Sequence, residues 1–268
     1  MALREDVVYR YDGTPDGMLT CIFESYRLHE FPSAILSPRD AQCSLFETRF
    51  IPSDQEKAER VLNGLRRTAG HEAADLVLLS HCTCLPEKER CALSFTRLAM
   101  NTGFGVCSRM TDHRVNVLQQ AVRFLQTEAH HLCGFIRFTE ADHTLVSLIT
   151  PRNDVLPLLD EHFSDRFPEE RFIIYDRGRL QALMHLPGES RIVPVRELKM
   201  PALSQDELDI QMLWRRFHQA IAIESRKNRT LQDHLLPLRF RPNMTEFQPH
   251  AAPFSSSALF DPKGALHS

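Results

Sequence analysis

The alternation of hydrophobic and polar positions is most regular between Arg114 and Leu186. From Val115 to Leu132 the apolar residues recur in steps of three and four, which is the spacing of one stripe on an amphipathic helix. The stripe consists of Val115, Leu118, Val122, Leu125, Ala129 and Leu132. Gly134 follows directly and predicts the end of this helix, because glycine readily adopts the left-handed conformation that closes many helices.

Four runs with the composition of β-strands come after the helix, and each pair of runs flanks a short polar turn. They are Phe135–Phe138, Leu145–Ile149, Phe172–Tyr175 and Leu180–Met184. This arrangement predicts two hairpins, with a short helix between them from about Asp154 to Phe167. The predicted fold class is therefore α+β: an antiparallel sheet of two hairpins, in an α-β-β-α-β-β core, packed against helices. The N- and C-terminal parts of the chain are expected to be helical.

The N-terminal part begins with an alternating strand at Val7–Tyr11 and the tight turn Asp12–Gly17. Thr14 or Asp16 is placed to cap the helix that should follow. A strand, a glycine turn and a helix start can also cradle a phosphate. The spacing fits neither a P-loop nor a dinucleotide fingerprint, so a structural turn is the preferred interpretation. Ser53–Glu56 has the form of a capping box and predicts another helix start.

These patterns divide the chain into three regions. Residues 1–80 form an N-terminal region of strand, turn and helix, residues 81–247 form the α+β core, and residues 248–268 are expected to be a flexible tail because few of them are anchoring residues. Within the core, Asp206 opens a long helix. One side of this helix is predicted to carry Leu208, Met212, Leu213, Phe217, Ala220, Ile221 and, at its end, Glu224.

The composition is that of an ordinary globular protein, with 43% hydrophobic and 25% charged residues. The seven cysteines are scattered and odd in number, and no hydrophobic signal segment follows Met1. Both observations favour free thiols in a reducing compartment, so a cytoplasmic location is expected. No apolar run approaches the roughly 20 residues that cross a bilayer, and no membrane contact is expected.

The net charge of −3 hides an uneven distribution. Residues 213–247 carry +4, and residues 1–212 carry −7, because residues 248–268 are neutral. The basic positions of this segment are Arg215, Arg216, Arg226, Lys227, Arg229, Arg239 and Arg241. A basic element on an acidic body is a candidate surface for phosphates. A solvated helix face rich in arginine explains the same charges.

One cluster of soft ligands hints at metal: Cys82, Cys84 and Cys91, together with His81. The spacing Cys-x-Cys is not that of the usual zinc knuckle, no second pair follows, and Cys91 falls within a predicted helix. Small buried thiols explain these cysteines sufficiently. The sequence therefore predicts no metal site and no cofactor.

The candidate catalytic groups are His162 and Asp176. His162 lies one helical turn from Arg166, Asp176 ends the third predicted strand, and Arg137 projects from the first. If these residues converge on one sheet edge, they would bind a phosphate or carry out acid/base chemistry. A structural salt-bridge network is the alternative. The sequence contains no G-x-S-x-G elbow, no catalytic cysteine motif and no H-E-x-x-H, so enzymatic activity stays an open question.

Several motifs, taken together, resemble a known family. They are Tyr11–Gly17, Glu128 with Gly134–Phe138, His162–Phe167, Ile174–Asp176, Leu213–Trp214, Ile223–Asn228, Pro237–Phe240 and Glu246. Across residues 7–247 they follow the order found in the bacterial DNA-metabolism protein family. The core of that family is a domain of unknown function that is often fused to a uracil-DNA glycosylase domain. Members that stand alone are typically encoded beside a radical-SAM protein similar to spore photoproduct lyase.

The resemblance implies DNA repair or modification, with DNA and the radical-SAM protein as expected partners. It supplies no established catalytic residues. This chain has no glycosylase domain and no Cys-x3-Cys-x2-Cys motif of a radical-SAM cluster, so such chemistry would belong to the partner.

Three functions are open at this point. The first is an accessory protein that binds DNA or assists the radical-SAM enzyme, with bases stacking on Trp214, Phe240 or Tyr175. The residues expected to bind phosphate or nucleic acid are Arg137, Arg166, Trp214, Arg215, Arg226, Asn228, Arg229 and Arg239. The second is an enzyme that acts on a nucleotide or a DNA base through the His162 and Asp176 set. The third is a structural partner subunit without nucleic-acid contact.

Overall fold

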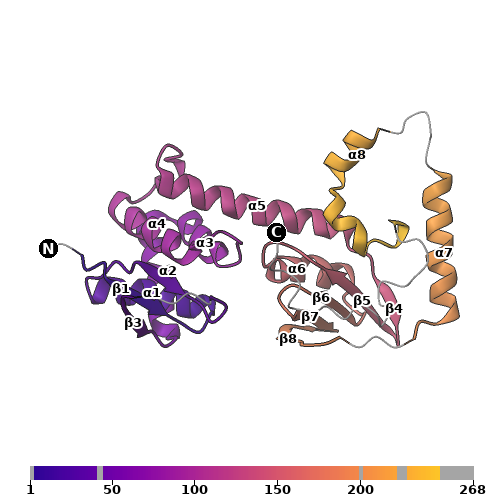
Figure 1. Cartoon of the computed structure of the whole chain (residues 1–268), viewed down its shortest axis with the longest axis horizontal. Coiled ribbons are helices and arrows are strands. Elements are labelled where there is room, and N and C mark those ends of the chain that lie inside the picture. Colours follow the sequence, from indigo (N-terminus) through magenta and orange to yellow (C-terminus); the bar gives the residue numbers. More distant parts are fainter. Residues whose placement is uncertain (1–2, 41–44, 199–201, 222–227, 248–268) are drawn as a thin grey trace. The chain divides into compact units, whose positions relative to one another are not determined.

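The computed structural model describes residues 3–40, 45–198, 202–221 and 228–247 (Figure 1). The predicted tail at 248–268 lies outside the described residues. The chain divides into two compact units. Unit 1 comprises residues 1–127 and 152–154, and unit 2 comprises residues 128–151 and 155–268. This partition differs from the regions 1–80 and 81–247 predicted from the sequence. Among the described residues, no helix is long and apolar enough to cross a membrane.

Unit 1 contains a parallel three-stranded sheet. Its strands are β1 (Val7–Arg10), β2 (Ala34–Leu36) and β3 (Glu47–Phe50), in the order β2-β1-β3. The first corresponds to the strand predicted at Val7–Tyr11 and the third to a strand that the sequence pattern predicts at Ser44–Ile51, whereas β2 lies in a proline-rich stretch that gave no strand signal. The helices of this unit are α1 (Pro15–Arg27), α2 (Gln55–Ala69), α3 (His71–Ser80) and α4 (Lys88–Thr102), followed by the short 3-10 helix η1 (Val106–Ser108).

The helix starts of unit 1 are fixed by side-chain caps. Thr14 Oγ1 accepts a hydrogen bond from Gly17 N at 3.0 Å, which confirms the predicted cap of α1. At α2 the cap is Asp54, whose Oδ1 accepts from Lys57 N at 3.1 Å. The predicted capping box at Ser53–Glu56 was therefore one residue too early.

Two tyrosines at β1 join the sheet to its surroundings. Tyr9 Oη donates to Glu30 at 2.5 Å, and Tyr11 Oη donates to Glu89 Oε1 of α4 at 2.8 Å. All four residues are buried, and burial raises the pKa of Tyr11 well above its usual range. Because a buried carboxylate is costly without partners, the bond between Tyr11 and Glu89 positions α4 against the end of β1.

The long helix predicted in the middle of the chain is α5 (His113–Phe135). All six apolar positions of the predicted stripe are at most 5% exposed, which confirms the helix and its buried face. Its end differs from the prediction. Gly134 lies inside the last turn and does not take a positive φ, so the helix continues to Phe135.

Unit 2 contains a five-stranded mixed sheet with the order β4-β5-β6-β7-β8. Its strands are β4 (Thr139–Ala141), β5 (Thr144–Ile149), β6 (Phe172–Asp176), β7 (Gln181–Leu186) and β8 (Glu189–Pro194). The hairpin of β6 and β7 is as predicted. The fold class α+β is confirmed, but the sheet is not purely antiparallel, because β5 and β6 run parallel and are joined through helix α6 (Leu156–Arg166).

The first predicted hairpin is displaced along the chain. Its first strand is not Phe135–Phe138 but β4, which pairs with β5 across a turn formed by Asp142 and His143, both at positive φ. Phe138 instead packs its ring 5.4 to 6.0 Å from the rings of Phe163, Phe167 and Phe172. The hydrophobic run was thus a packing signal and not a strand signal.

Helix α7 (Gln205–Ala220) departs from the ordinary amphipathic arrangement. Its buried residues are Glu207 and Gln211, which bond each other at 2.7 Å, and Gln211 Nε2 also contacts Thr139 Oγ1 at 3.4 Å. Many of its apolar residues are exposed, namely Leu208, Ile210, Met212, Leu213, Trp214 and Phe217, as is Ile221 just beyond its end. Unit 2 then ends with α8 (Arg229–Leu235) and the 3-10 helices η3 (Leu238–Asn243) and η4 (Thr245–Phe247).

We expect His81 to make the stability of unit 1 depend on pH. Its Nε2 lies 3.1 Å from the carbonyl oxygen of Gly13, and burial, with the nearby charge of Lys88, lowers the pKa of His81 to about 4. The folded state therefore binds fewer protons than the unfolded state between pH 6.5 and 4. The contribution of His81 to the free energy of unfolding is therefore complete above about pH 6.5, and it should fall by roughly 2 to 3 kcal/mol as the pH drops to 4.

The measurement is urea unfolding across this pH range for the wild type and for His81→Gln. The difference between their free energies of unfolding should shrink as the pH falls. The exposed His113→Gln variant is the control. Parallel pH profiles for the wild type and His81→Gln would contradict the prediction.

Candidate functional site

The structure does not join the two predicted catalytic groups. His162 is exposed on α6 with its ring 4.9 Å from that of Phe163, and no hydrogen bond or ion pair links it to Asp176 among the described residues. Asp176 is fully buried and accepts hydrogen bonds from Gly178 N at 2.9 Å and from Arg179 Nη1 at 2.9 Å. Burial raises the pKa of Asp176, although Arg179 opposes this shift. These contacts shape the turn between β6 and β7.

The two arginines expected at the same site are also separated. Arg166 is exposed, and its guanidinium lies 5.6 Å from the ring centre of Phe167. Arg137 instead bonds Glu246 Oε1 at 2.9 Å and lies 5.9 Å from the ring centre of Trp214. Trp214 Nε1 donates to the other carboxylate oxygen of Glu246 at 3.3 Å. Arg137, Trp214 and Glu246 therefore form one cluster in which the carboxylate, 3% exposed, has both oxygens bonded.

A second buried carboxylate, Glu128 on α5, pairs with Arg239 at 3.2 Å. Next to it, the ring of Phe240 packs 5.4 Å from Phe135 and 6.1 Å from His131. These contacts anchor η3 to the end of α5. Most of the motifs by which the sequence resembles a known family thus have structural contacts within unit 2.

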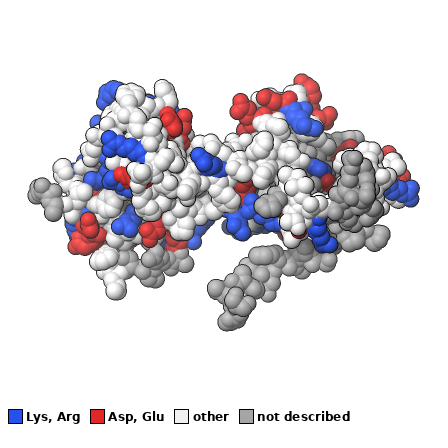
Figure 2. Space-filling view, turned by 90° about the horizontal axis from the view of Figure 1, so that it is seen from above, with Lys and Arg blue, Asp and Glu red and all other residues white. Residues whose placement is uncertain are grey.

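The basic segment is only partly available for a ligand. Arg239 is paired with Glu128, and Arg241 pairs with Asp233 at 2.6 Å. Asn228 caps α8 by accepting from Leu231 N at 3.0 Å, and Arg229 is exposed. On α7, Arg215 is half-buried and its neighbour Arg216 exposed. Arg226, also predicted to bind phosphate, lies outside the described residues. On the face that Figure 2 shows, the described basic side chains lie in separate patches and not in one continuous band.

The cysteines predicted to be unligated form no metal-binding group within the described part of the chain. Cys82, Cys84 and Cys91 form no disulfide with another described cysteine, and Cys84 is exposed. The backbone beside them is held by Asn153, whose Oδ1 accepts from Cys84 N at 2.9 Å. Burial raises the pKa of Cys91, so its thiol is less reactive than a free one.

A serine and histidine cluster lies between α6, β7 and β8. His185 Nδ1 is 2.8 Å from Ser190 Oγ and 3.2 Å from Ser164 Oγ, and Ser164 donates to Asp160 at 3.0 Å. The other ring nitrogen of His185 is buried and has no hydrogen-bond partner among the residues that the structure describes, and the ring stacks on Phe172 at 4.6 Å. In a catalytic triad a carboxylate orients the histidine from that second nitrogen. No carboxylate of the described residues does so here, and the hydrogen bonds of the cluster join α6 to β7 and β8.

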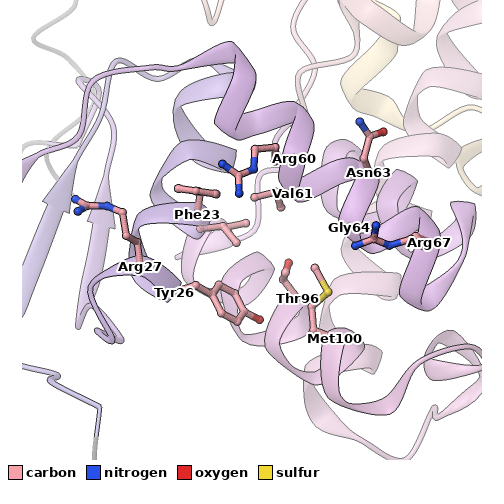
Figure 3. A pocket seen from close by; sticks show the side chains of 11 residues that line it. Phe23, Tyr26, Arg27, Arg60, Val61, Asn63, Gly64, Arg67, Thr96 and Met100 are labelled. Carbon is pink, nitrogen blue, oxygen red and sulfur yellow. The ribbon is translucent and has the colours of Figure 1, made fainter.

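Unit 1 contains a groove that the residue pattern did not predict (Figure 3). Its volume is about 770 Å³, and α1, α2 and α4 supply its walls. The apolar part of the lining consists of Ile22, Phe23, Val61 and Met100, to which Tyr26 adds a second aromatic ring. The polar part consists of Arg27, Arg60, Arg67, Asn63 and Thr96. Figure 3 shows the guanidinium groups spread around the apolar centre.

The guanidinium groups give the groove a positive rim. The group of Arg60 lies 5.0 Å from the ring centre of Phe23. Within the described residues, neither Arg60 nor Arg67 has a carboxylate within 4.0 Å. The charge of Arg27 is offset by Glu24 at 2.6 Å. Two exposed arginines beside an aromatic and apolar floor can bind a ligand that combines negative charge with a flat apolar group.

The groove residues could have been predicted from their spacing in the sequence. Phe23, Tyr26 and Arg27 lie at i, i+3 and i+4 of one helix, and Arg60, Gly64 and Arg67 lie at i, i+4 and i+7 of another. Each set therefore occupies one helix face. What periodicity alone could not provide is that the two faces meet.

Comparison with known proteins yields one family. The model of a domain of unknown function, DUF4130, matches residues 86–246. This range lies inside the region 81–247 that the sequence pattern sets apart as the core, and it includes α4 but not α1 or α2. No curated protein and no solved structure matches the chain.

We expect the Arg137 and Glu246 pair to stabilise unit 2. Arg137→Met removes one of the two partners of the Glu246 carboxylate, which is 3% exposed and keeps its bond from Trp214; hydrogen bonds to charged groups contribute about 1.5 to 3 kcal/mol. Urea unfolding should show a loss near the lower end of this range, because the arginine itself is 28% exposed. The control is Arg191→Met, which breaks the exposed pair with Glu189 and should cost less than about 1 kcal/mol. Equal losses in the two variants would count against a special role for the cluster.

Proposed function

Because the chain belongs to the DUF4130 family, and its motifs resemble those of the bacterial DNA-metabolism proteins, we propose that it is an accessory protein of DNA repair or modification. In this role it binds DNA and assists a radical-SAM repair enzyme. The proposed DNA contact is the groove of unit 1, and not the predicted basic segment of unit 2.

The observation that carries the DNA-binding proposal is the combination of arginines and aromatic rings in this groove. Arg60 and Arg67 are exposed and would contact phosphates, which supply most of the affinity for DNA. Phe23 and Tyr26 offer apolar faces on which a base can stack. Lys57 lies 6.0 Å from the ring centre of Phe23, but its charge is offset by Glu24 at 3.2 Å and Asp54 at 3.1 Å, so the positive charge of the groove rests on Arg60 and Arg67. The groove thus combines the two kinds of contact that sequence-independent DNA binding requires.

A second observation supports a protein partner. The apolar side chains of α7 point to solvent, with Ile210, Leu213 and Phe217 each at least 55% exposed. Exposed apolar patches of this kind mark interaction surfaces. The side of α7 that faces unit 2 buries the polar residues Glu207 and Gln211, so a partner that covers the other side would bury the apolar residues. The proposed occupant of this face is the radical-SAM enzyme, because the resemblance implies such a partner.

Removing both exposed arginines of the groove should weaken DNA binding and its dependence on salt. For Arg60→Ala combined with Arg67→Ala, two lost phosphate contacts should lower the magnitude of the log-log salt slope by about 1.4 to 1.8. The measurement is fluorescence anisotropy with a labelled DNA strand at several salt concentrations. The matched control is Arg215→Ala with Arg216→Ala on α7, which removes the same charge from unit 2 and should leave the slope nearly unchanged.

If the α7 variant lowered the salt slope and the groove variant did not, the DNA contact would lie on α7, and the proposed site would be wrong. No DNA binding by the wild type at low salt would overturn the proposed function itself.

Charge on the apolar face of α7 should disrupt the partner contact. Leu213→Glu with Phe217→Glu places two carboxylates where an apolar surface would be buried, at a cost of several kcal/mol. Co-purification with the radical-SAM protein should therefore be lost. The control is Phe104→Glu, at an exposed phenylalanine of unit 1. Retained co-elution of the α7 variant would rule out this face as the contact.

A further inference from the structure

The floor of the groove contains a hydroxyl group without a partner. Thr96 on α4 is fully buried, and its Oγ1 has no hydrogen-bond partner among the described residues. Threonine in a helix ordinarily bonds a carbonyl of the preceding turn. Figure 3 shows Thr96 between Tyr26 and Met100, with its oxygen directed toward the space between the helices. An unbonded buried hydroxyl is costly, and a ligand that reaches it would remove this cost.

The ring of Tyr26, on the α1 side of the groove, is held in place. The guanidinium of Arg97 lies 4.7 Å from the ring centre of Tyr26 and 5.5 Å from that of Phe31. Arg97 itself donates to the carbonyl oxygens of Ser25 at 3.1 Å and Glu30 at 2.7 Å. Tyr26 is therefore supported from one side while 38% of it stays exposed. A ring held this way loses little conformational entropy when a flat ligand stacks on it.

Gly64 keeps the α2 side of the groove open. It lies in the middle of α2, where glycine costs about 1 kcal/mol relative to alanine. A Cβ at this position would come within 3.0 Å of Met100 Cε. Glycine at this position therefore lowers the intrinsic stability of α2 but leaves space in the groove. The thioether of Met100, facing the same space, adapts its shape readily to a flat ligand.

These features specify a flat apolar ligand with a hydrogen-bonding edge and nearby negative charge. A nucleotide unit meets all three conditions. The volume of about 770 Å³ lies within the range of small-molecule pockets, about 300 to 1,000 Å³, and is far too small for a stacked duplex. In a duplex both faces of each base are covered by neighbouring bases, so only an unpaired base can stack on Tyr26 and reach Thr96.

We infer that the groove binds an unpaired base of a single DNA strand, with the base between Tyr26 and Met100, its edge on Thr96 Oγ1, and the flanking phosphates on Arg60 and Arg67. This inference rests on the proposed DNA binding and narrows it to one substrate class. The hydroxyl both donates and accepts, so it bonds any of the four bases. The site thus selects for the absence of pairing and not for sequence.

The experiment compares a strand of about 16 nucleotides with the same strand in a duplex, both carrying one fluorescent 2-aminopurine base. The wild type should bind the strand more tightly than the duplex and should quench the probe. Tyr26→Ala should weaken strand binding by about 5- to 150-fold, the range for loss of one stacked base, whereas Tyr26→Phe retains the ring. Thr96→Val, which keeps the shape of the side chain, should weaken it by about 2- to 12-fold. Thr96→Ser keeps the hydroxyl and is its control.

Thermal melts of every variant establish that the fold is intact. Equal affinity for strand and duplex, together with equal binding by Tyr26→Ala, would overturn the inference while DNA binding through Arg60 and Arg67 still stood. Displacement of the strand by an equal concentration of a free deoxynucleoside monophosphate would also overturn it. A complete lack of DNA binding would instead refute the proposed function.

Discussion

Two β-strands that follow each other in sequence and run parallel must be joined by a crossover, because the chain has to return to the end of the sheet from which it started. This constraint governs both units. In unit 1 the crossover from β1 to β2 contains α1, and in unit 2 the crossover from β5 to β6 contains α6. The parallel pairing therefore places a helix against each sheet before any side chain of a site is considered.

The groove of unit 1 is a consequence of that placement. Helix α1 is held by its cap at Thr14, and α4 is tied to the end of β1 through Tyr11 and Glu89. Helix α2 packs against both of them, with Gly64 at the point of close approach. Phe23, Tyr26 and the exposed arginines are thus brought together by backbone architecture. Arg60 and Arg67 form no ion pair with any of the residues that the structure describes, whereas Arg27 pairs with Glu24, so the first two are available to a ligand.

Unit 2 uses its charged groups differently. Two arginines predicted to bind phosphate are neutralised by buried carboxylates, Arg137 by Glu246 and Arg239 by Glu128. The candidate catalytic Asp176 pairs with Arg179. Such pairs are needed because each carboxylate is almost fully buried, and an unpaired buried charge is far more costly than a paired one. The exposed apolar side of α7 is the complementary feature of this unit, since its polar residues face the interior.

The sequence by itself determined the elements whose signal is local. The six-residue stripe of α5, the cap of α1 and the hairpin of β6 and β7 all follow from periodicity or turn chemistry, because neighbouring residues suffice to specify them. It singled out Arg137 as a phosphate-binding candidate and Glu246 as a motif residue, but not that the two pair with each other.

Tertiary structure alone decided which elements lie together. Strand alternation is the same in parallel and antiparallel ladders, so the pairing of β5 with β6 could not be predicted from it. Helical periodicity identified an apolar side of α7 but not that this side faces solvent. It likewise gave no sign that Tyr26, Arg60 and Thr96, far apart in the chain, line one groove. Contacts between distant residues depend on packing, which a local pattern does not encode.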